Sequence, residues 1–191
     1  MIKNSEFKII LCFSLLFLIS ACKQSKNLFQ ENVNDWSSYG DANWLFSDNT
    51  LTGNIQNGEG YLITKQNYRD FELKLEFKPD STINSGVFIR CNSENMNPKT
   101  CYELNIWDLH PDQTNRTGAI VAKANPLANV TTINQWNTYR ILAKESQLKV
   151  WINDTLTIDA MDSFSATGYI GLQAKGNGKV SFRNIKITTL N

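Results

Sequence analysis

A short alternating run carries the side chains best suited to chemistry. Between Tyr102 and Trp107, apolar residues alternate with Glu103, Asn105 and Trp107. A β-strand over this run would bury the apolar set and present the other three on its outer face. A carboxylate and an amide can hydrogen-bond adjacent hydroxyl groups, and an indole ring can stack on the C–H face of a pyranose. These side chains therefore suit the binding of a sugar.

Four more residues are expected on the same face, because they lie on or at the ends of neighbouring strand-like segments. They are Asn84, Arg90, Trp151 and Gln173. The pattern fits a structural network equally well, in which Arg90 pairs with Glu103 only to fill a shallow groove.

The segment Asp108-Leu109-His110-Pro111-Asp112 follows directly and holds the single histidine of the chain. Asp108 and His110 share a parity on an extended segment, so they could form a base or part of a divalent-metal site. One histidine cannot supply a His-rich zinc site. In the alternative, which this pattern alone favours, Asp108 caps a turn after the strand and His110 is merely exposed.

The elements that position these residues are predicted to be strands. Apolar and polar residues alternate over 71–77, 102–107, 148–153 and 180–183, and turn sequences such as Asn153-Asp154 separate the runs. No long amphipathic helix is predicted, although one short helical turn is expected near 159–164. We therefore predict an all-β fold, a concanavalin-like jelly-roll sandwich of two antiparallel sheets.

The N-terminus has the features of a lipoprotein signal peptide. Two lysines precede an uncharged apolar run at 9–19, which is short for a membrane span. Ile19-Ser20-Ala21-Cys22 fits the cleavage pattern that leaves Cys22 to receive a lipid. An ordinary signal peptide with a chance cysteine is the alternative. We divide the chain into a signal peptide (1–21), a lipid-anchored tether (22–34) and one folded domain (35–191).

The charge balance bears on the expected partners, and the cysteines bear on the expected cellular compartment. The 19 basic and 18 acidic residues nearly balance, so nucleic acid is not an expected partner. A lipid anchor predicts a place in the cell envelope, on the periplasmic face of the outer membrane. In this oxidising compartment Cys91 and Cys101 are expected to form a disulfide across a hairpin, with two free thiols as the alternative.

Eight segments, in order and spacing, resemble those of the 3-keto-disaccharide hydrolase domain family, long known as a domain of unknown function. They are 68–77, 84–90, 102–108, 117–120, 135–139, 151–153, 171–173 and 180–187. The resemblance covers the chain from about Asp35 to Leu190. It implies a concanavalin-like sandwich in a secreted or lipid-anchored protein that cleaves glycosides whose glucose carries a ketone at C3.

The chemistry implied by this resemblance begins at the ketone, which acidifies the proton on C2. A base removes this proton, and a cation or hydrogen-bond donors stabilise the enolate. The C1 substituent then leaves by elimination, and water can add afterwards. A divalent metal ion could assist, and a sugar oxidoreductase would be a functional partner because it makes the ketone.

The family motifs also suggest roles for individual residues. We expect catalytic roles for Glu103, Asp108, His110 and Lys175, and substrate contacts from Asn84, Arg90, Asn105, Trp107, Trp151 and Gln173. The chain departs from the pattern at two family histidines, which are replaced by Val150 and Lys175, and at a glycine, replaced by Asp154. Losing these histidines removes candidate metal ligands or bases, although Lys175 could itself stabilise an enolate.

Three functions follow. The first is an enzyme that cleaves 3-keto-glucosides, the second is a non-catalytic carbohydrate-binding sandwich, and the third is a lipoprotein whose polar face docks a protein partner.

Overall fold

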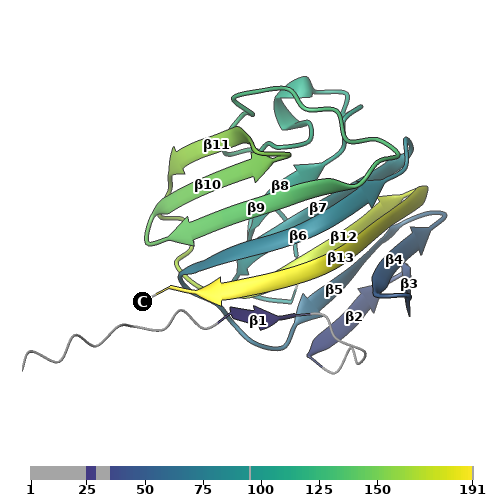
Figure 1. Cartoon of the computed structure of the whole chain (residues 1–191), viewed down its shortest axis with the longest axis horizontal. Coiled ribbons are helices and arrows are strands. Elements are labelled where there is room, and N and C mark those ends of the chain that lie inside the picture. Colours follow the sequence, from purple (N-terminus) through teal and green to yellow (C-terminus); the bar gives the residue numbers. More distant parts are fainter. Residues whose placement is uncertain (1–24, 29–34, 95, 191) are drawn as a thin grey trace, which may run out of the picture.

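The computed structural model describes residues 25–28, 35–94 and 96–190, which form two antiparallel sheets packed face to face (Figure 1). The larger sheet has the order β11-β10-β9-β6-β13-β4-β3, and β1 also pairs with β13. Its strands are β1 (Ser25–Asn27), β3 (Asn43–Ser47), β4 (Thr50–Ile55), β6 (Phe71–Pro79), β9 (Asn137–Lys144), β10 (Gln147–Ile152), β11 (Thr155–Met161) and β13 (Gly178–Thr189).

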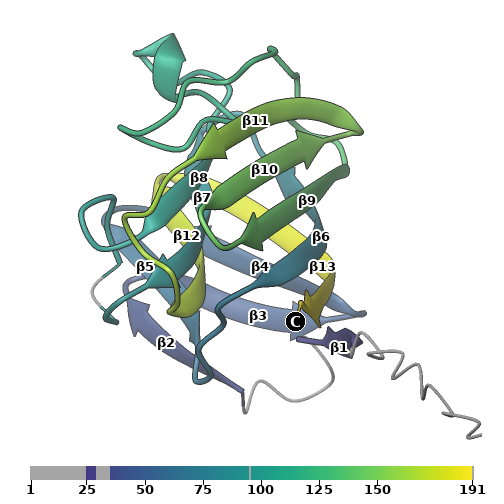
Figure 2. The ribbon, with the colours of Figure 1, turned by 90° about the vertical axis from the view of Figure 1, so that its left-hand side faces the viewer.

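The smaller sheet has the order β2-β5-β12-β7-β8 (Figure 2). Its strands are β2 (Trp36–Gly40), β5 (Glu59–Thr64), β7 (Ile83–Cys91), β8 (Tyr102–Ile106) and β12 (Tyr169–Gly176). The predicted all-β sandwich of antiparallel sheets is confirmed. The helical turn expected near 159–164 is wrong, because its first residues complete β11; a short 3₁₀ helix lies instead at Gln113–Asn115. None of the described helical structure is long and apolar enough to cross a membrane.

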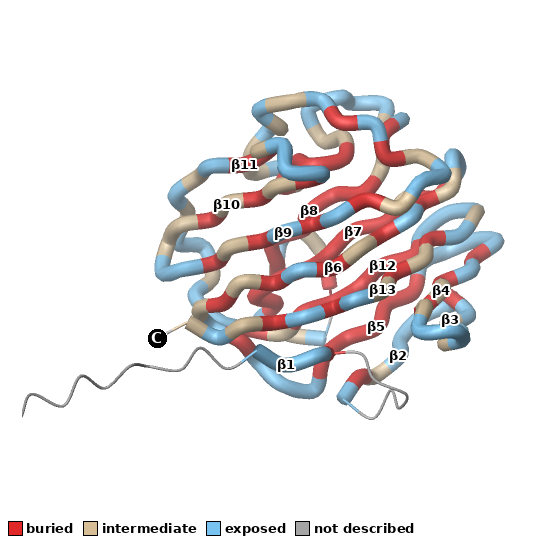
Figure 3. The backbone as a smooth tube through the Cα atoms, in the orientation of Figure 1, coloured by how far each residue is buried: buried red, intermediate tan, exposed pale blue. Residues whose placement is uncertain are grey.

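The core lies between the sheets and is built from the alternating positions (Figure 3). Phe71, Leu73, Leu75 and Phe77 of β6 are each at most 3% exposed. Each such side chain removed from water contributes about 1.5–3 kcal/mol. Because a slip of one residue would turn these side chains outward, the core fixes the register of the strands.

Residues before the predicted domain boundary at Asp35 also pair with the larger sheet. Ser25–Asn27 pair with Thr188, Ile187 and Lys186 of β13. Leu28 is buried, and its carbonyl accepts a hydrogen bond from Trp36 Nε1 at 2.8 Å. Part of the segment expected to be a tether is therefore an edge strand of the larger sheet. The predicted signal peptide, Cys22 and residues 29–34 lie outside the described residues.

Arg90 departs from the predicted alternation. A β-bulge interrupts the pairing of β7 with β12, where Phe88 faces Gly171 but Cys91 faces Tyr169, and Arg90 has φ = 50°. The side chain therefore leaves the outer face of the sheet. Its guanidinium bonds the Asp70 carboxylate at 2.9 Å, and Arg90 pairs with Asp70 instead of Glu103.

The Arg90 guanidinium joins separate parts of the fold. It is fully buried and donates to three backbone carbonyls, those of Arg69, Glu145 and Ser165. Burial lowers the pKa of Arg90, and the Asp70 charge opposes this shift. The arrangement is that of a structural clamp, not of a substrate ligand.

We expect Arg90→Met to reduce the free energy of unfolding by about 3 kcal/mol, because the Asp70 carboxylate and the three backbone carbonyls lose their hydrogen-bond donor. Urea unfolding measures the loss. The matched control is Arg140→Met, whose side chain is 44% exposed over Trp151 and should cost less than about 1 kcal/mol. Equal losses in both variants would show that Arg90 is no clamp.

Candidate functional site

The candidate site lies on the outer face of the smaller sheet, where the register lines up side chains from four strands. Three neighbouring cross-strand rows form its floor. The rows are Glu59, Lys175 and Asn84; Tyr61, Gln173, Gly86 and Asn105; and Ile63, Gly171, Phe88 and Glu103. Gly86 adds no side chain to the middle row, and the space over it is bordered by Glu103 Cγ and Gln173 Oε1.

A pocket of about 300 Å³ opens over these rows. Its lining includes Asn84, Glu103, Asn105, His110, Gln173 and Lys175 of the residues predicted from sequence, together with Glu59, Tyr61, Phe88, Met96, Asn97, Pro98 and Val121. The prediction that Glu103 and Asn105 share an outward face is thus confirmed. The volume is at the lower end for small-molecule sites.

Four predicted site residues are not among those that line the pocket. Arg90 belongs to the clamp described above. Asp108 is buried, and its carboxylate accepts hydrogen bonds from the Thr132 amide at 2.6 Å and hydroxyl at 2.7 Å. Asp108 therefore anchors a loop, as the structural alternative predicted.

The two tryptophans lie apart from each other and cannot form a common platform. Trp107 packs edge-on against His110, with ring centroids 4.6 Å apart. Trp151 is on β10 of the other sheet, where the Arg140 guanidinium stacks 3.7 Å from its ring centre. The expectation that Trp151 shares a face with Glu103 is wrong, because β10 and β8 belong to different sheets.

Glu103 is the most perturbed carboxylate of the pocket. It is 8% exposed, and burial raises its pKa to about 7. Lys175 lowers this pKa and Glu59 raises it, but both effects are smaller than that of burial. A carboxyl group that titrates near neutral pH can take up or release a proton under ordinary conditions.

An ion pair lies at the edge of the pocket. The Lys175 ammonium is 3.0 Å from the Glu59 carboxylate, and both side chains are about half exposed. The pair is accessible to solvent, so its contribution to stability is small. Its lysine nevertheless lines the same pocket as Glu103, whose pKa it lowers.

His110 has a defined tautomer. Its Nδ1 accepts a hydrogen bond from the Asp112 backbone amide at 3.0 Å. The neutral ring therefore carries its proton on Nε2. Since His110 lines the pocket, this N–H is a candidate donor to a ligand.

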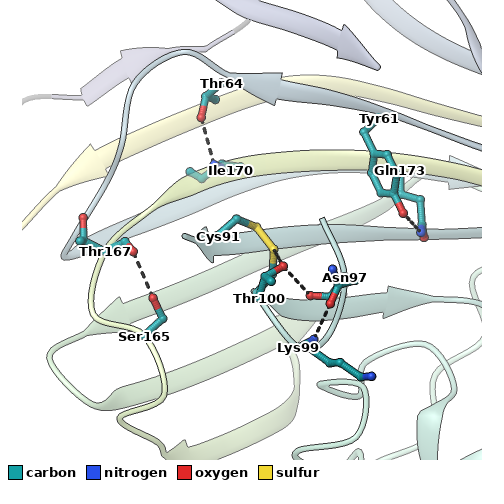
Figure 4. The surroundings of a disulfide bond; sticks show 11 residues. Tyr61, Thr64, Cys91, Asn97, Lys99, Thr100, Ser165, Thr167, Ile170 and Gln173 are labelled. Carbon is teal, nitrogen blue, oxygen red and sulfur yellow. Dashed lines mark hydrogen bonds between the residues drawn. A yellow bond between two sulfur atoms is a disulfide. The ribbon is translucent and has the colours of Figure 1, made fainter. Parts of the chain in front are cut away.

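The disulfide loop builds one wall. Cys91 and Cys101 form the predicted disulfide, and Met96 packs into the notch that Gly171 leaves in the sheet. Asn97 Oδ1 accepts a bond from the Lys99 amide at 2.9 Å, and the Thr100 hydroxyl bonds the Asn97 carbonyl (Figure 4). The crosslink thus holds Met96 and its neighbours against the pocket.

Sequence reasoning missed Glu59 and Tyr61. The signal that could have found them is the nearly continuous apolar run of β5, whose last five residues are all buried. Such a run indicates a strand covered on both faces. Here the disulfide loop adds a small apolar cluster of Tyr61, Ile63, Phe88 and Met96 to the outer face, with Cys91 and Cys101.

The described residues offer no group of side chains that would bind the predicted divalent metal ion. Within the described part of the chain, no three His, Cys, Asp or Glu side chains gather closely enough to hold a metal ion. Glu59, Glu103 and His110 of the pocket form no such group.

Comparison with known proteins places the chain among carbohydrate-related folds. The model of a family described as the 3-keto-alpha-glucoside-1,2-lyase-like domain matches residues 24–188. A candidate glycosyl hydrolase from Parabacteroides distasonis is 26% identical, with a TM-score of 0.75 over 87% of this chain and 100% of that one. No curated protein matches the chain in sequence.

More distant structures share the fold. A carbohydrate-binding module from Bacillus subtilis is 18% identical, with a TM-score of 0.63 over 80% of this chain and 94% of that one. A β-glucanase from Bacillus licheniformis is 15% identical, with a TM-score of 0.63 over 90% and 100%. These likenesses confirm the predicted jelly-roll sandwich.

The buried Glu103 carboxyl should make stability depend on pH. Its folded-state pKa of about 7 lies above the ordinary 4.5, so its contribution to stability is present below the unfolded value and is lost as pH rises through 7. We expect Glu103→Gln to gain stability relative to the native chain between pH 5 and pH 8, by about 2 kcal/mol. Urea unfolding at both pH values measures the gain. The exposed Glu145→Gln should show no such change, and a pH-independent difference for Glu103→Gln would contradict the assignment.

Proposed function

Because the chain belongs to the family of 3-keto-alpha-glucoside-1,2-lyase-like domains, we propose that it cleaves glucosides that carry a ketone at C3. The observation that carries the proposal is the Glu103 carboxyl, which is buried in a polar pocket and has a pKa of about 7. A general base works best when its pKa lies near the operating pH. The proposed reaction is an elimination that begins at C2.

In the first step, the Glu103 carboxylate takes the proton from C2 of the sugar. The electron pair of the C–H bond forms a C2=C3 double bond, and the ketone oxygen becomes an enolate. Lys175 lines the same pocket as Glu103, and its ammonium group offsets the negative charge that develops on this oxygen.

In the second step, the enolate re-forms the ketone and the C1–O bond breaks. The departing oxygen takes the proton that Glu103 received in the first step, which restores the carboxylate, while His110 Nε2–H donates a hydrogen bond to this oxygen. The products are an alcohol and a 1,2-unsaturated 3-keto sugar. When water adds across the double bond, its hydroxyl goes to C1 and C2 is protonated, which gives net hydrolysis.

This route differs from ordinary glycoside hydrolysis. A pair of carboxylates flanking the scissile bond is the usual requirement, whereas the elimination needs one carboxyl group that takes and returns a proton, one cation and one hydrogen-bond donor. The substrate must first be oxidised at C3, so a sugar oxidoreductase is the proposed functional partner.

We expect the chain from Lys23 onward to release nitrophenol from nitrophenyl 3-keto-glucosides, with kcat/KM rising with pH and levelling off above about 7, because only the ionised Glu103 is a base. Glu103→Gln should reduce kcat by about 10³-fold, and Lys175→Met by about 10–100-fold. His110→Ala should slow the cleavage of alkyl 3-keto-glucosides much more than that of nitrophenyl 3-keto-glucosides. Nitrophenolate is a stable anion that leaves without a proton, whereas an alkoxide does not.

Glu145→Gln, an exposed carboxylate outside the pocket lining, is the control and should keep full activity. Stabilisation by keto sugars without any turnover would overturn catalysis and favour the carbohydrate-binding alternative. Stabilisation by no sugar would favour the protein-docking alternative.

We also propose that the chain is anchored in the cell envelope by a lipid on Cys22, on the periplasmic face of the outer membrane. The pairing of Ser25–Asn27 with β13 supports a close attachment. Three residues span at most about 10 Å, so such an anchor would hold the domain against the lipid surface.

We expect cells that express the chain to incorporate labelled palmitate into it, and Cys22→Ser to abolish the label and release the protein from the membrane fraction. Lys23→Ser is the matched control and should remain labelled. Unchanged membrane association of Cys22→Ser would count against lipid anchoring.

A further inference from the structure

Positive charge collects on the outer face of the larger sheet, here called the basic face. On β6, β9, β10, β11 and β13, eight basic and three acidic side chains alternate with the core residues and point outward. The rest of the described chain carries eight basic and thirteen acidic side chains. The near balance of charge in the sequence therefore conceals a molecule with one strongly positive face.

The acidic side chains of the basic face are already occupied. Glu72, Glu76 and Asp159 each form an ion pair with a cation of the same face. Four further lysines of the face have no carboxylate oxygen within 4 Å of the ammonium group among the described residues. Their charges are therefore available to an external anion. They are Lys78, Lys144, Lys179 and Lys186.

Strand pairing also places like charges side by side. Lys186 of β13 is directly opposite Lys74 of β6, and Lys74 is directly opposite Arg140 of β9. Glu72 offsets the charges of Lys74 and Arg140. Like charges directly opposite each other destabilise a sheet. Such departures from favourable local pairing are typical of functional surfaces.

A small hollow on the basic face suits a phosphate group. Its volume is about 160 Å³, and its lining includes Lys78, Lys179, Ser181 and Trp136. Asp80 also lines the hollow, but its carboxylate accepts hydrogen bonds from three backbone amides. Two ammonium groups and a hydroxyl group are suitable donors to phosphate oxygens.

Two tryptophans add an interfacial character to the basic face. The Arg183 guanidinium lies 4.0 Å from the ring centre of Trp136, and the Arg140 guanidinium lies 3.7 Å from that of Trp151. Tryptophan is enriched where apolar and aqueous surroundings meet, as at the surface of a membrane. The combination of lysine, arginine and tryptophan favours a phospholipid surface as the partner.

The proposed lipid anchor joins the fold at the rim of the same sheet. Ser25 begins β1, which pairs with β13 (Figure 1), and Cys22 is three positions earlier in the sequence. An anchor at the rim limits the distance to the lipid but does not decide which face turns toward it. The distribution of charge does, because anionic headgroups attract the basic face and repel the rest of the molecule.

We propose that the basic face docks on anionic phospholipid headgroups of the membrane, so that the pocket on the other sheet opens away from the lipid. The orientation rests on the proposed anchor at Cys22, whereas the attraction does not. Each basic side chain near an anionic membrane surface strengthens binding by about 5-fold.

The first experiment uses the chain from Lys23 onward, which contains every strand of the sandwich and carries no lipid. Flotation measures its binding to vesicles of phosphatidylcholine alone and to vesicles of equal parts phosphatidylcholine and phosphatidylglycerol. We expect binding to the anionic vesicles to be tighter by more than about 100-fold, and to weaken as salt screens the charges.

Matched variants locate the surface that binds. Replacing Lys78, Lys179 and Lys186 together by Gln should weaken binding to the anionic vesicles by about 100-fold. All three are exposed, so thermal unfolding should change little. The control replaces three exposed cations outside the basic face and removes the same charge, so it should keep tight binding. These cations are Lys65, Arg69 and Lys99.

The second experiment measures orientation on the full, lipid-anchored chain. An amine-reactive reagent is applied to membranes and to detergent-released protein, and mass spectrometry locates the modified lysines. We expect Lys78 and Lys186 to be protected on the membrane, and Lys99 and Lys175 to be modified equally in both samples.

The outcomes separate this proposal from the proposed anchor. No preference for anionic vesicles, an equal loss of binding in the control, or protection of Lys99 and Lys175 instead of the basic face overturns the proposal. Binding to heparin without binding to vesicles overturns it in favour of an acidic polymer. A preference that is lost only with the lysines of the basic face supports the docking surface, even where Cys22 carries no lipid.

Discussion

The apolar core between the two sheets sets the register on which the pocket depends. Because Leu104, Val87 and Leu172 must face the core, their neighbours Glu103, Gly86 and Gln173 must face outward. Antiparallel pairing then brings outward residues from β5, β12, β7 and β8 into straight rows. Core packing therefore determines which side chains face the pocket and how they line up across the strands.

The outer face of the smaller sheet is unusual in being partly covered. The disulfide loop buries one end of the rows beneath Met96, and the loop that carries His110 closes the side along β8. Covering the face removes water from Glu103, which costs stability at neutral pH and gives the carboxyl a pKa of about 7. The burial that lowers stability at neutral pH thus also gives Glu103 the pKa that the proposed reaction needs.

Much of this organisation could be predicted from the sequence, since alternation reveals which strand residues face outward. Glu103, Asn105 and Gln173 were found in this way. Alternation could not predict Arg90, because a bulge changes the parity at one residue, nor Trp151, because a one-dimensional pattern does not say which sheet a strand joins. Tyr61 lies on β5, a strand whose apolar residues do not alternate. Such a strand is expected to be covered on both faces, but the sequence does not say that the disulfide loop covers the outer one.

The short strand β1 affects whether the edge of β13 is open to pairing with another copy of the chain. One edge of β13 is paired with β4 from Gly178 to Phe182 and with β1 from Lys186 to Thr188. A chain that started at the expected boundary, Asp35, would leave the second stretch with free backbone donors and acceptors and would open the apolar seat of Leu28. Bare strand edges recruit other strands. Ser25–Asn27 thus cover a stretch of the β13 edge that could otherwise pair with a strand of another copy.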